Sequence, residues 1–172
     1  MTRLEQLKNK VDELYQARNE ERADWADWLY ENHVFVVAGY AGELADRFGA
    51  SKELAMAAGM LHDVADAVMK RENAEHEEKS LGIARQLLRE VGFSDEEIRV
   101  VVDDAIRFHS CHNGNVPQMP DGKVLATADA LAHLKRDFYD HAIETFRADK
   151  ASVEDMKKWV FSKLERDFNA KI

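Results

Sequence analysis

The pattern of apolar positions along this chain predicts an all-helical protein. Apolar residues recur every three or four positions, the spacing that places them on one face of an α-helix. Strands would appear as alternating runs rich in Val, Ile and Thr, and the sequence contains no such run. The clearest apolar stripes cover residues 4–14, 25–48, 54–68, 83–91, 98–106, 124–132 and 153–164.

Residue types at the ends of these stripes agree with helix boundaries. Thr2 and Glu5 have the spacing of a capping box, in which a hydroxyl and a carboxylate satisfy free N–H groups at the start of a helix. Ser94 and Glu97 repeat this spacing. Gly49 follows a stripe at the position where a glycine commonly ends a helix.

The length of 172 residues predicts a single domain. The one long loop that we expect covers residues 110–121, which include both prolines of the chain. Its position directly after His109 suits a lid over a site. The stripe over residues 4–14 could bind a partner helix or a second copy in a homodimer, although packing on its own domain is the favoured interpretation.

Charge and composition exclude several classes of protein. The 33 acidic and 24 basic residues give a formal net charge of −9, which argues against a general nucleic-acid binder and against docking on an anionic membrane. No uncharged run is long enough to span a membrane. The single cysteine, Cys111, cannot form an internal disulfide, so a reducing compartment, the cytoplasm, fits best. An anionic substrate is still allowed, because a bound cation can dominate one cleft.

Histidines and aspartates in apolar surroundings are the candidate chemistry. Asp63 and Asp129 each lie among small apolar residues, where a carboxylate is costly to bury unless it is paired or binds a metal. Imidazoles and carboxylates that converge from several helices would form a site for a divalent cation. Four of the seven histidines lie on or at the end of apolar helix faces: His33, His62, His76 and His109.

A simpler interpretation has to be weighed for each of these residues. A single histidine on an apolar face is more often a hydrogen-bonded core residue than a metal ligand. Asp129 could pair with His133, one turn along the same predicted helix. What favours the metal site is that several separate helices each present a residue of the metal-binding type.

The ordered set of these residues resembles the HD-domain phosphohydrolase superfamily. The segments AAGMLHDVAD, AIRFHS and ATADALAH resemble the helices of that family that carry its histidines and its final aspartate. The resemblance covers about residues 30–135, and leaves a helix over 2–18 and helices over 136–168 as extensions. It implies a helical bundle around one or two divalent ions, with metal ligands at four positions: His33, His62, Asp63 and Asp129.

The same resemblance implies roles for further residues. His76 and His109 stand where some members bind a second metal and others contact phosphate, and His112 is a weaker candidate. Asp66 stands where some nucleotidase members carry an acidic group for proton transfer, although it could equally be a solvated helix position. Asp63, as a ligand, could also bridge two metals.

The function that the resemblance implies is a metal-dependent phosphohydrolase. Its substrate would be a small phosphate ester or anhydride, of a nucleotide type. A mixed imidazole and carboxylate set suits Mn, Fe, Co, Ni or Zn, with Mg less favoured. The alternatives are a non-catalytic helical module that binds a metal, nucleotide or signalling ligand, and a helical interaction protein without a metal. No phosphate-binding residue can be assigned from spacing, since cations such as Arg71 and Arg107 are equally expected on the surface.

Overall fold

The computed structural model describes residues 1–169, and in this range every secondary-structure element is a helix, as the apolar pattern predicts. Two elements, η1 and η3, are π-helical, and two, η2 and η4, are short 3₁₀ helices. No described helix is long and apolar enough to cross a membrane. The elements in chain order are α1 (Arg3–Gln16), α2 (Ala26–Leu29), η1 (Tyr30–Val34), α3 (Phe35–Phe48), α4 (Lys52–Leu61), η2 (Val64–Ala67), α5 (His76–Glu90), α6 (Asp95–Ile98), η3 (Arg99–Ile106), η4 (His112–Gly114), α7 (Pro120–Lys135), α8 (Phe138–Ala148) and α9 (Val153–Asn169).

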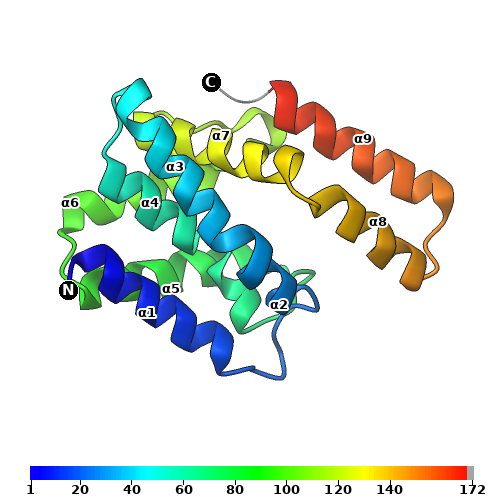
Figure 1. Cartoon of the computed structure of the whole chain (residues 1–172), viewed down its shortest axis with the longest axis horizontal. Helices are drawn as coiled ribbons and strands as arrows, with labels where there is room; N and C mark the ends of the chain where they lie inside the picture. The colour runs from blue at the N-terminus through cyan, green and yellow to red at the C-terminus, as the bar shows by residue number, and fades with distance from the viewer. Residues whose placement is uncertain (170–172) are drawn as a thin grey trace.

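Helices α3, α4 and α7 contact one another at the centre of the bundle (Figure 1). Small residues allow this close packing. A Cβ atom added at Gly59 of α4 would lie 2.7 Å from the Cα atom of Ala38 on α3, which is too close for any side chain. Helices α1 and α5 and the π-helix η3 pack around this centre, so that residues far apart in sequence meet at one point.

The predicted helix ends are confirmed. Both capping boxes form, at Thr2 with Glu5 and at Ser94 with Glu97. Gly49 ends α3 in the left-handed conformation, with φ of 68°. That conformation favours glycine because it lacks a Cβ atom.

The apolar face of α1 packs on its own domain. Leu7 and Val11 are fully buried, and Tyr15 stacks on Tyr30 with ring centroids 5.2 Å apart. The favoured interpretation of this stripe is therefore confirmed. The alternative of a partner helix is wrong for these side chains, because the domain core already covers them.

Two predicted boundaries are wrong. The stripe over residues 54–68 is not one helix: α4 ends at Leu61, and His62 and Asp63 lead into the 3₁₀ helix η2. The loop predicted over 110–121 ends earlier, because α7 begins at Pro120. Proline suits the first turn of a helix, where its missing N–H has no partner to lose.

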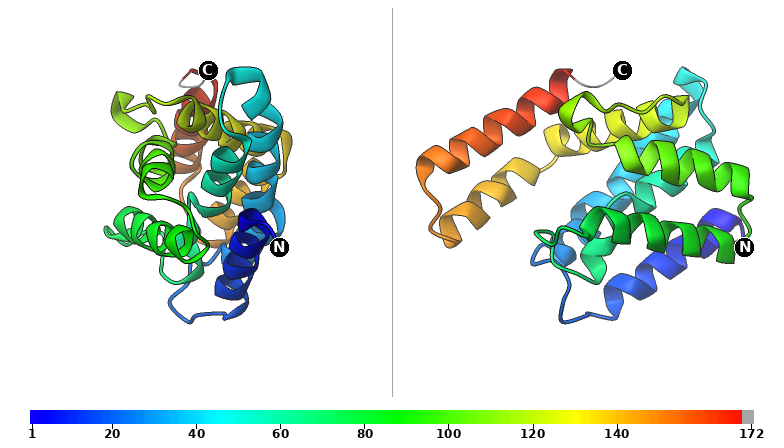
Figure 2. Two further views of the ribbon diagram at one scale, coloured as in Figure 1. Left: turned by 90° about the vertical axis from the view of Figure 1, so that its left-hand side faces the viewer. Right: turned by 180° about the vertical axis from the view of Figure 1, so that it is seen from behind.

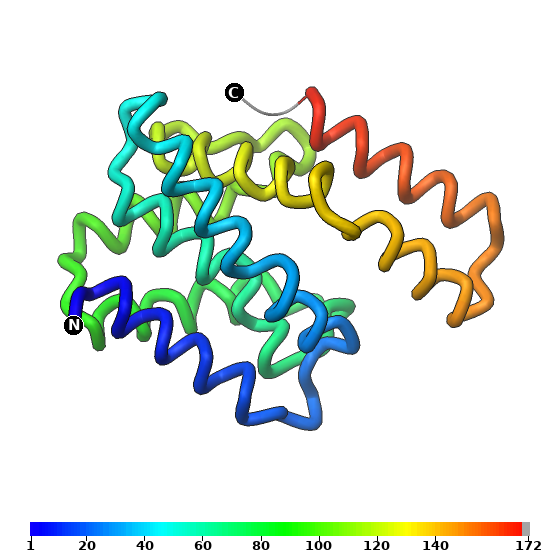
Figure 3. Tube along the Cα trace, in the orientation of Figure 1, coloured from blue at the N-terminus to red at the C-terminus, as the bar shows by residue number. Residues whose placement is uncertain are grey.

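Helices α8 and α9 form a hairpin that extends away from the bundle (Figures 1 and 2). The chain path in Figure 3 shows α9 running back beside α8 toward α7. Contacts between α9 and α7 hold the end of the hairpin against the bundle. This return brings α9 into contact with His133 of α7.

Candidate metal centre

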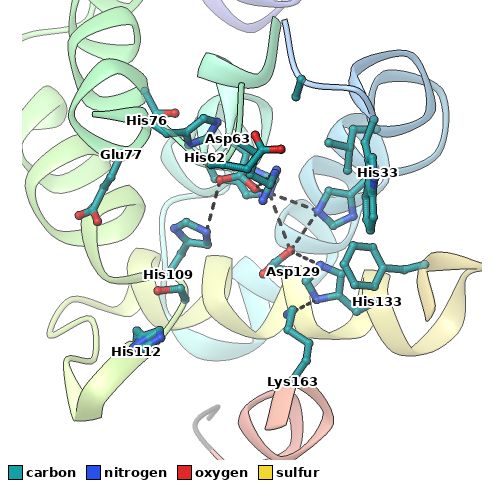
Figure 4. Close-up of a pocket in the computed structure, with 18 of the residues that line it drawn as sticks. His33, His62, Asp63, His76, Glu77, His109, His112, Asp129, His133 and Lys163 are labelled. Carbon is teal, nitrogen blue, oxygen red and sulfur yellow. Dashed lines mark hydrogen bonds and ion pairs between the residues drawn. The ribbon is translucent and has the colours of Figure 1, made fainter. Parts of the chain in front are cut away.

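Four separate parts of the chain direct imidazole and carboxylate groups toward one point (Figure 4). His33 comes from η1, Asp129 from α7, and His109 from the turn after η3. His62 and Asp63 come from the turn after α4. The structure thus brings together five of the residues singled out in the sequence.

Local backbone geometry aims these side chains. The π-helical turn η1 carries His33, and the π-helix η3 ends three residues before His109. A π-turn adds a residue to the helical register and so rotates the side chains beyond it, a feature frequent at functional sites. The end of α4 at Leu61 also redirects side chains. Adjacent residues inside a helix point in different directions, whereas His62 and Asp63, which follow the helix, both face the site.

Three buried side chains form the tighter group. The Nε2 atom of His33 lies 3.1 Å from Oδ1 of Asp129 and 3.3 Å from Nε2 of His62. His62 Nε2 lies 3.8 Å from the same Asp129 oxygen. One ligand atom from each of these residues lies within 4.8 Å of the others, a spacing that could hold a metal ion.

A second group shares His62 and opens toward solvent. Nε2 of His62 lies 3.9 Å from Oδ2 of Asp63, and Nε2 of His109 lies 3.9 Å from Oδ1 of Asp63. Their ligand atoms also lie within 4.8 Å of one another. Asp63 therefore belongs to the second group and not to the first, and it lies next to the first group through the shared His62.

Backbone carbonyls fix the protonation of two of the imidazoles. Nδ1 of His62 lies 2.9 Å from the carbonyl of Gly59, and Nδ1 of His109 lies 2.6 Å from that of Ile106. A carbonyl only accepts, so each Nδ1 carries the proton and donates it. The lone pair of each ring then lies on Nε2, which faces the site, as in metal-ligating histidines.

The donor set fits a divalent cation. Oδ1 of Asp129 is buried and has no hydrogen-bond partner in the described part of the chain. An anionic oxygen in this state is costly unless a cation compensates it. The imidazole nitrogens of His33 and His62 beside this oxygen complete a mixed imidazole and carboxylate set, which suits a first-row transition metal.

Electrostatics keep these groups in their ligating forms. Burial opposes ionisation of Asp63, but its interactions with the charge of Arg71 and with the neighbouring imidazoles outweigh it and hold the pKa of Asp63 well below its usual value. For Asp129, burial is likewise outweighed, chiefly by His133 and His33, and its pKa is also well below the usual value. Burial lowers the pKa of His109, which favours its neutral imidazole.

Asp66 lies apart from both groups of candidate ligands. Its carboxylate is fully buried and accepts hydrogen bonds from Nε and Nη2 of Arg71. Nε2 of His76 donates to it over 2.9 Å. Arg71 also donates to Oδ2 of Asp63 over 2.8 Å. The cluster of Asp66, His76 and Arg71 therefore holds Asp63 in place. The expected role of Asp66 in proton transfer stays a prediction.

Sequence reasoning missed most of the pocket that surrounds these residues. The pocket has a volume of about 620 Å³ and includes the exposed His112 and the half-buried His76. Arg71, which was equally expected on the surface, is one of its lining residues. The hairpin and the segment before α2 add residues that no motif signals: Trp25, Phe138, Trp159, Lys163 and Arg166.

The expected pairing of Asp129 with His133 is present. Nε2 of His133 lies 3.3 Å from Oδ1 of Asp129, and the His133 ring stacks on that of His33 with centroids 4.9 Å apart. Burial lowers the pKa of His133 to about 4, so the ring is neutral at pH 7. The far side of the ring meets α9, through Lys163 and Asp167.

Comparison with known proteins agrees with this geometry. The family model described as HD domain matches residues 30–134, more than half of the chain. The chain is 29% identical to Ribonuclease Y of Petrotoga mobilis over 126 residues, which are 73% of this chain and 22% of that protein. It is 26% identical to Ribonuclease Y of Thermotoga maritima over 127 residues, which are 74% of this chain and 23% of that protein.

These relatives are therefore much longer than the segment they share with this chain. No solved structure matches the chain significantly. The family match spans η1 to α7, the elements that supply His33, His62, Asp63, His109 and Asp129. The chain therefore belongs to the HD-domain superfamily of metal-dependent phosphohydrolases.

Proposed function

We propose that this protein is a metal-dependent phosphohydrolase that cleaves a small, nucleotide-like phosphate ester or anhydride. The observation that carries the proposal is the buried Oδ1 of Asp129, which accepts no hydrogen bond from the described residues and lies beside Nε2 of His33 and His62. Such an oxygen at a pocket of about 620 Å³ has the setting of a metal ligand within reach of a substrate.

In this proposal the metal ligands are those that the family resemblance implies: His33, His62, Asp63 and Asp129. A divalent ion held there supplies Lewis acidity, which lowers the pKa of a water ligand and polarises a phosphoryl oxygen. His109 either holds a second ion together with Asp63 and His62 or contacts the phosphate. Its protonated Nδ1 is tied to the Ile106 carbonyl, so Nε2 is the atom that acts.

Asp66 and His76 act in this proposal as a support for the site. His76 uses its Nε2–H to bind Asp66, so in this proposal Nδ1 is the ring nitrogen that meets a substrate or a second ion. Asp66 holds Arg71 in the pocket wall, where the guanidinium also meets Asp63. A guanidinium in this position can bind a phosphate oxygen of the substrate.

The walls of the pocket support a nucleotide-like substrate. Aromatic side chains gather on the side formed by the hairpin, where the rings of Phe138 and Trp159 stack with centroids 6.3 Å apart. Cationic side chains, among them Arg71 and Arg107, line the pocket elsewhere. An apolar ring surface beside cations suits a base joined to a phosphate.

A phosphodiester in RNA is the second candidate substrate, because the relatives are named Ribonuclease Y and match about three-quarters of this chain. The net charge of −9 favours the small substrate, since RNA binding requires a basic surface. A non-catalytic module with the same ligands is the third possibility.

The test is a hydrolysis screen of purified protein after its metal content is measured by mass spectrometry. The panel holds p-nitrophenyl phosphate, its bis-ester, nucleoside phosphates and short RNA, each with added Mn, Co, Ni, Zn, Fe or Mg. Metal-dependent release of phosphate from nucleotides supports the proposal. Cleavage of RNA alone would replace the substrate, and bound metal without turnover on any compound would support the non-catalytic module.

A further inference from the structure

The C-terminal helix reaches the metal centre although it lies outside the residues that match the family. Nζ of Lys163 on α9 lies 2.9 Å from Nδ1 of His133 on α7. Asp167, one turn along α9, accepts from Lys163 at 2.9 Å and 3.2 Å. The side chains of Lys163, His133 and Asp167 are 16%, 6% and 1% exposed, so this contact is well shielded from water.

The chemistry of these groups determines where the proton of His133 lies. An ammonium group only donates hydrogen bonds, so the contact of 2.9 Å with Lys163, shorter than that with Asp167, assigns Nδ1 of His133 the role of acceptor. The proton of the neutral ring is then on Nε2, 3.3 Å from Oδ1 of Asp129. His133 therefore turns an N–H toward the metal-site carboxylate without completing a hydrogen bond to Oδ1, and it has no lone pair on that side to offer a metal.

The nearby Asp167 explains why the tautomer of His133 depends on Lys163. Its Oδ2 lies 3.2 Å from the same Nδ1 of His133. Without the ammonium, this carboxylate would draw the ring proton to Nδ1, and the Nε2 lone pair would face the anionic Asp129. In the structure, Lys163 and the hydroxyl of Tyr139, 2.7 Å from Oδ2, satisfy Asp167 and prevent this change.

We propose that Lys163 is a positioning residue of the metal centre, which sets the tautomer of His133 and through it the orientation of Asp129. The hairpin of α8 and α9 accordingly contributes a residue that positions the candidate metal ligands. The inference rests on the metal centre in the proposed function, but its first consequence, the tautomer, can be measured without any metal.

The first experiment records long-range ¹H–¹⁵N spectra of the metal-free protein, with His133 assigned from a His133→Gln variant. We expect the wild-type ring to carry its proton on Nε2, and the Lys163→Met variant to carry it on Nδ1. Lys163→Arg, which also donates, should retain the wild-type tautomer. A wild-type ring protonated on Nδ1 would overturn the inference, and that result needs no variant to fold.

The second experiment titrates Co²⁺ into wild-type protein and variants, by calorimetry and by the visible absorption of the bound ion. Loss of a group behind a metal ligand typically weakens metal binding by about 10- to 100-fold, and we expect this for Lys163→Met. Lys157→Met, on an exposed part of α9, is the matched control and should leave the affinity unchanged.

These outcomes separate the inference from the proposed function. Equal Co²⁺ affinity in wild type and a folded Lys163→Met variant would overturn the inference and leave the proposed function standing. A wild-type protein with the expected tautomer that binds no divalent ion would instead overturn the proposed function, and with it the role of Lys163 at a metal.

Discussion

Two buried aspartates beside the same pocket have opposite surroundings. Asp66 is fully buried, and its oxygens accept from Arg71 and His76. Asp129 is almost as buried, yet within residues 1–169 its Oδ1 has no hydrogen bond and is approached by three imidazole nitrogens. A carboxylate that its neighbours already satisfy stabilises the fold, whereas one left unsatisfied is suited to bind a cation.

A similar difference in surroundings distinguishes Asp66 from Asp63, although the two aspartates look alike in the sequence. Asp63 and Asp66 are three positions apart, and both follow the helix α4. Asp63 faces the pocket and is half-buried, while Asp66 points into the cluster behind it. The contrast predicts that loss of Asp129 affects metal binding, whereas loss of Asp66 affects stability.

The largest expected effect is that of Asp129→Asn on metal binding and turnover. The variant loses the charge that compensates the ion, so we expect at least about a 1,000-fold fall in Co²⁺ affinity and in hydrolysis, or about 4 kcal/mol. Calorimetry and the hydrolysis screen measure the two quantities.

Asp46→Asn is the matched control, because Asp46 is an exposed carboxylate on α3. It should change neither quantity. If Asp129→Asn kept wild-type affinity for every metal of the panel, the contrast between the two aspartates would not hold.

The next effect is that of Asp66→Asn on stability. Breaking a buried ion pair typically costs about 3 to 5 kcal/mol, and the half-exposed guanidinium of Arg71 places this variant at about 3 kcal/mol or less. Urea unfolding of the metal-free protein measures the loss. Metal at a concentration of about 100 times its Kd should still raise the free energy of unfolding of this variant by about 2.7 kcal/mol.

Urea unfolding of Asp129→Asn, with and without metal, tests the same contrast from the other side. For this variant we expect a smaller loss of stability than for Asp66→Asn in the metal-free protein, and no stabilisation by metal. A larger loss for Asp129→Asn than for Asp66→Asn would reverse the assignment of the two carboxylates.

The smallest effect concerns a charge cluster at the start of α1, which serves as a partly exposed reference. Arg3 binds Glu53 and Glu97, and its hydrogen bonds lower the pKa of Glu97 to about 2 from an ordinary 4.5. Such a depressed pKa stabilises the fold fully above pH 4.5, and the contribution is lost as the pH falls toward 2. Because these side chains are about a third exposed, we expect Arg3→Met to cost about 1 kcal/mol at pH 7.

Urea unfolding at pH 7 and at about pH 3 measures this difference, which should shrink at the lower pH because Glu97 becomes protonated in the unfolded chain while it is still largely ionised in the folded protein. Arg147→Met, at an exposed arginine of α8, is the control and should show no such dependence. A cost for Arg3→Met that grows on acidification would contradict the assigned ion pair.

Much of the fold and part of the site follow from local sequence signals. Periodic apolar stripes predict the helices, and the pairs Thr2–Glu5 and Ser94–Glu97 predict two helix starts. Polar residues in apolar stripes indicate the central histidines and aspartates, because burial of such groups requires a partner. These signals lie within one or two helical turns and can be read without a structure.

Tertiary structure alone decided how those residues are used. His76 and His109 have similar sequence settings, but only His109 joins a group of candidate ligands, while His76 binds Asp66. The end of α4 at Leu61 and the reach of Lys163 to His133 likewise have no local signal. Each of these features depends on packing between segments that are distant in the chain. Whether a buried carboxylate is satisfied or left to bind a cation is likewise decided by the side chains that other helices place beside it.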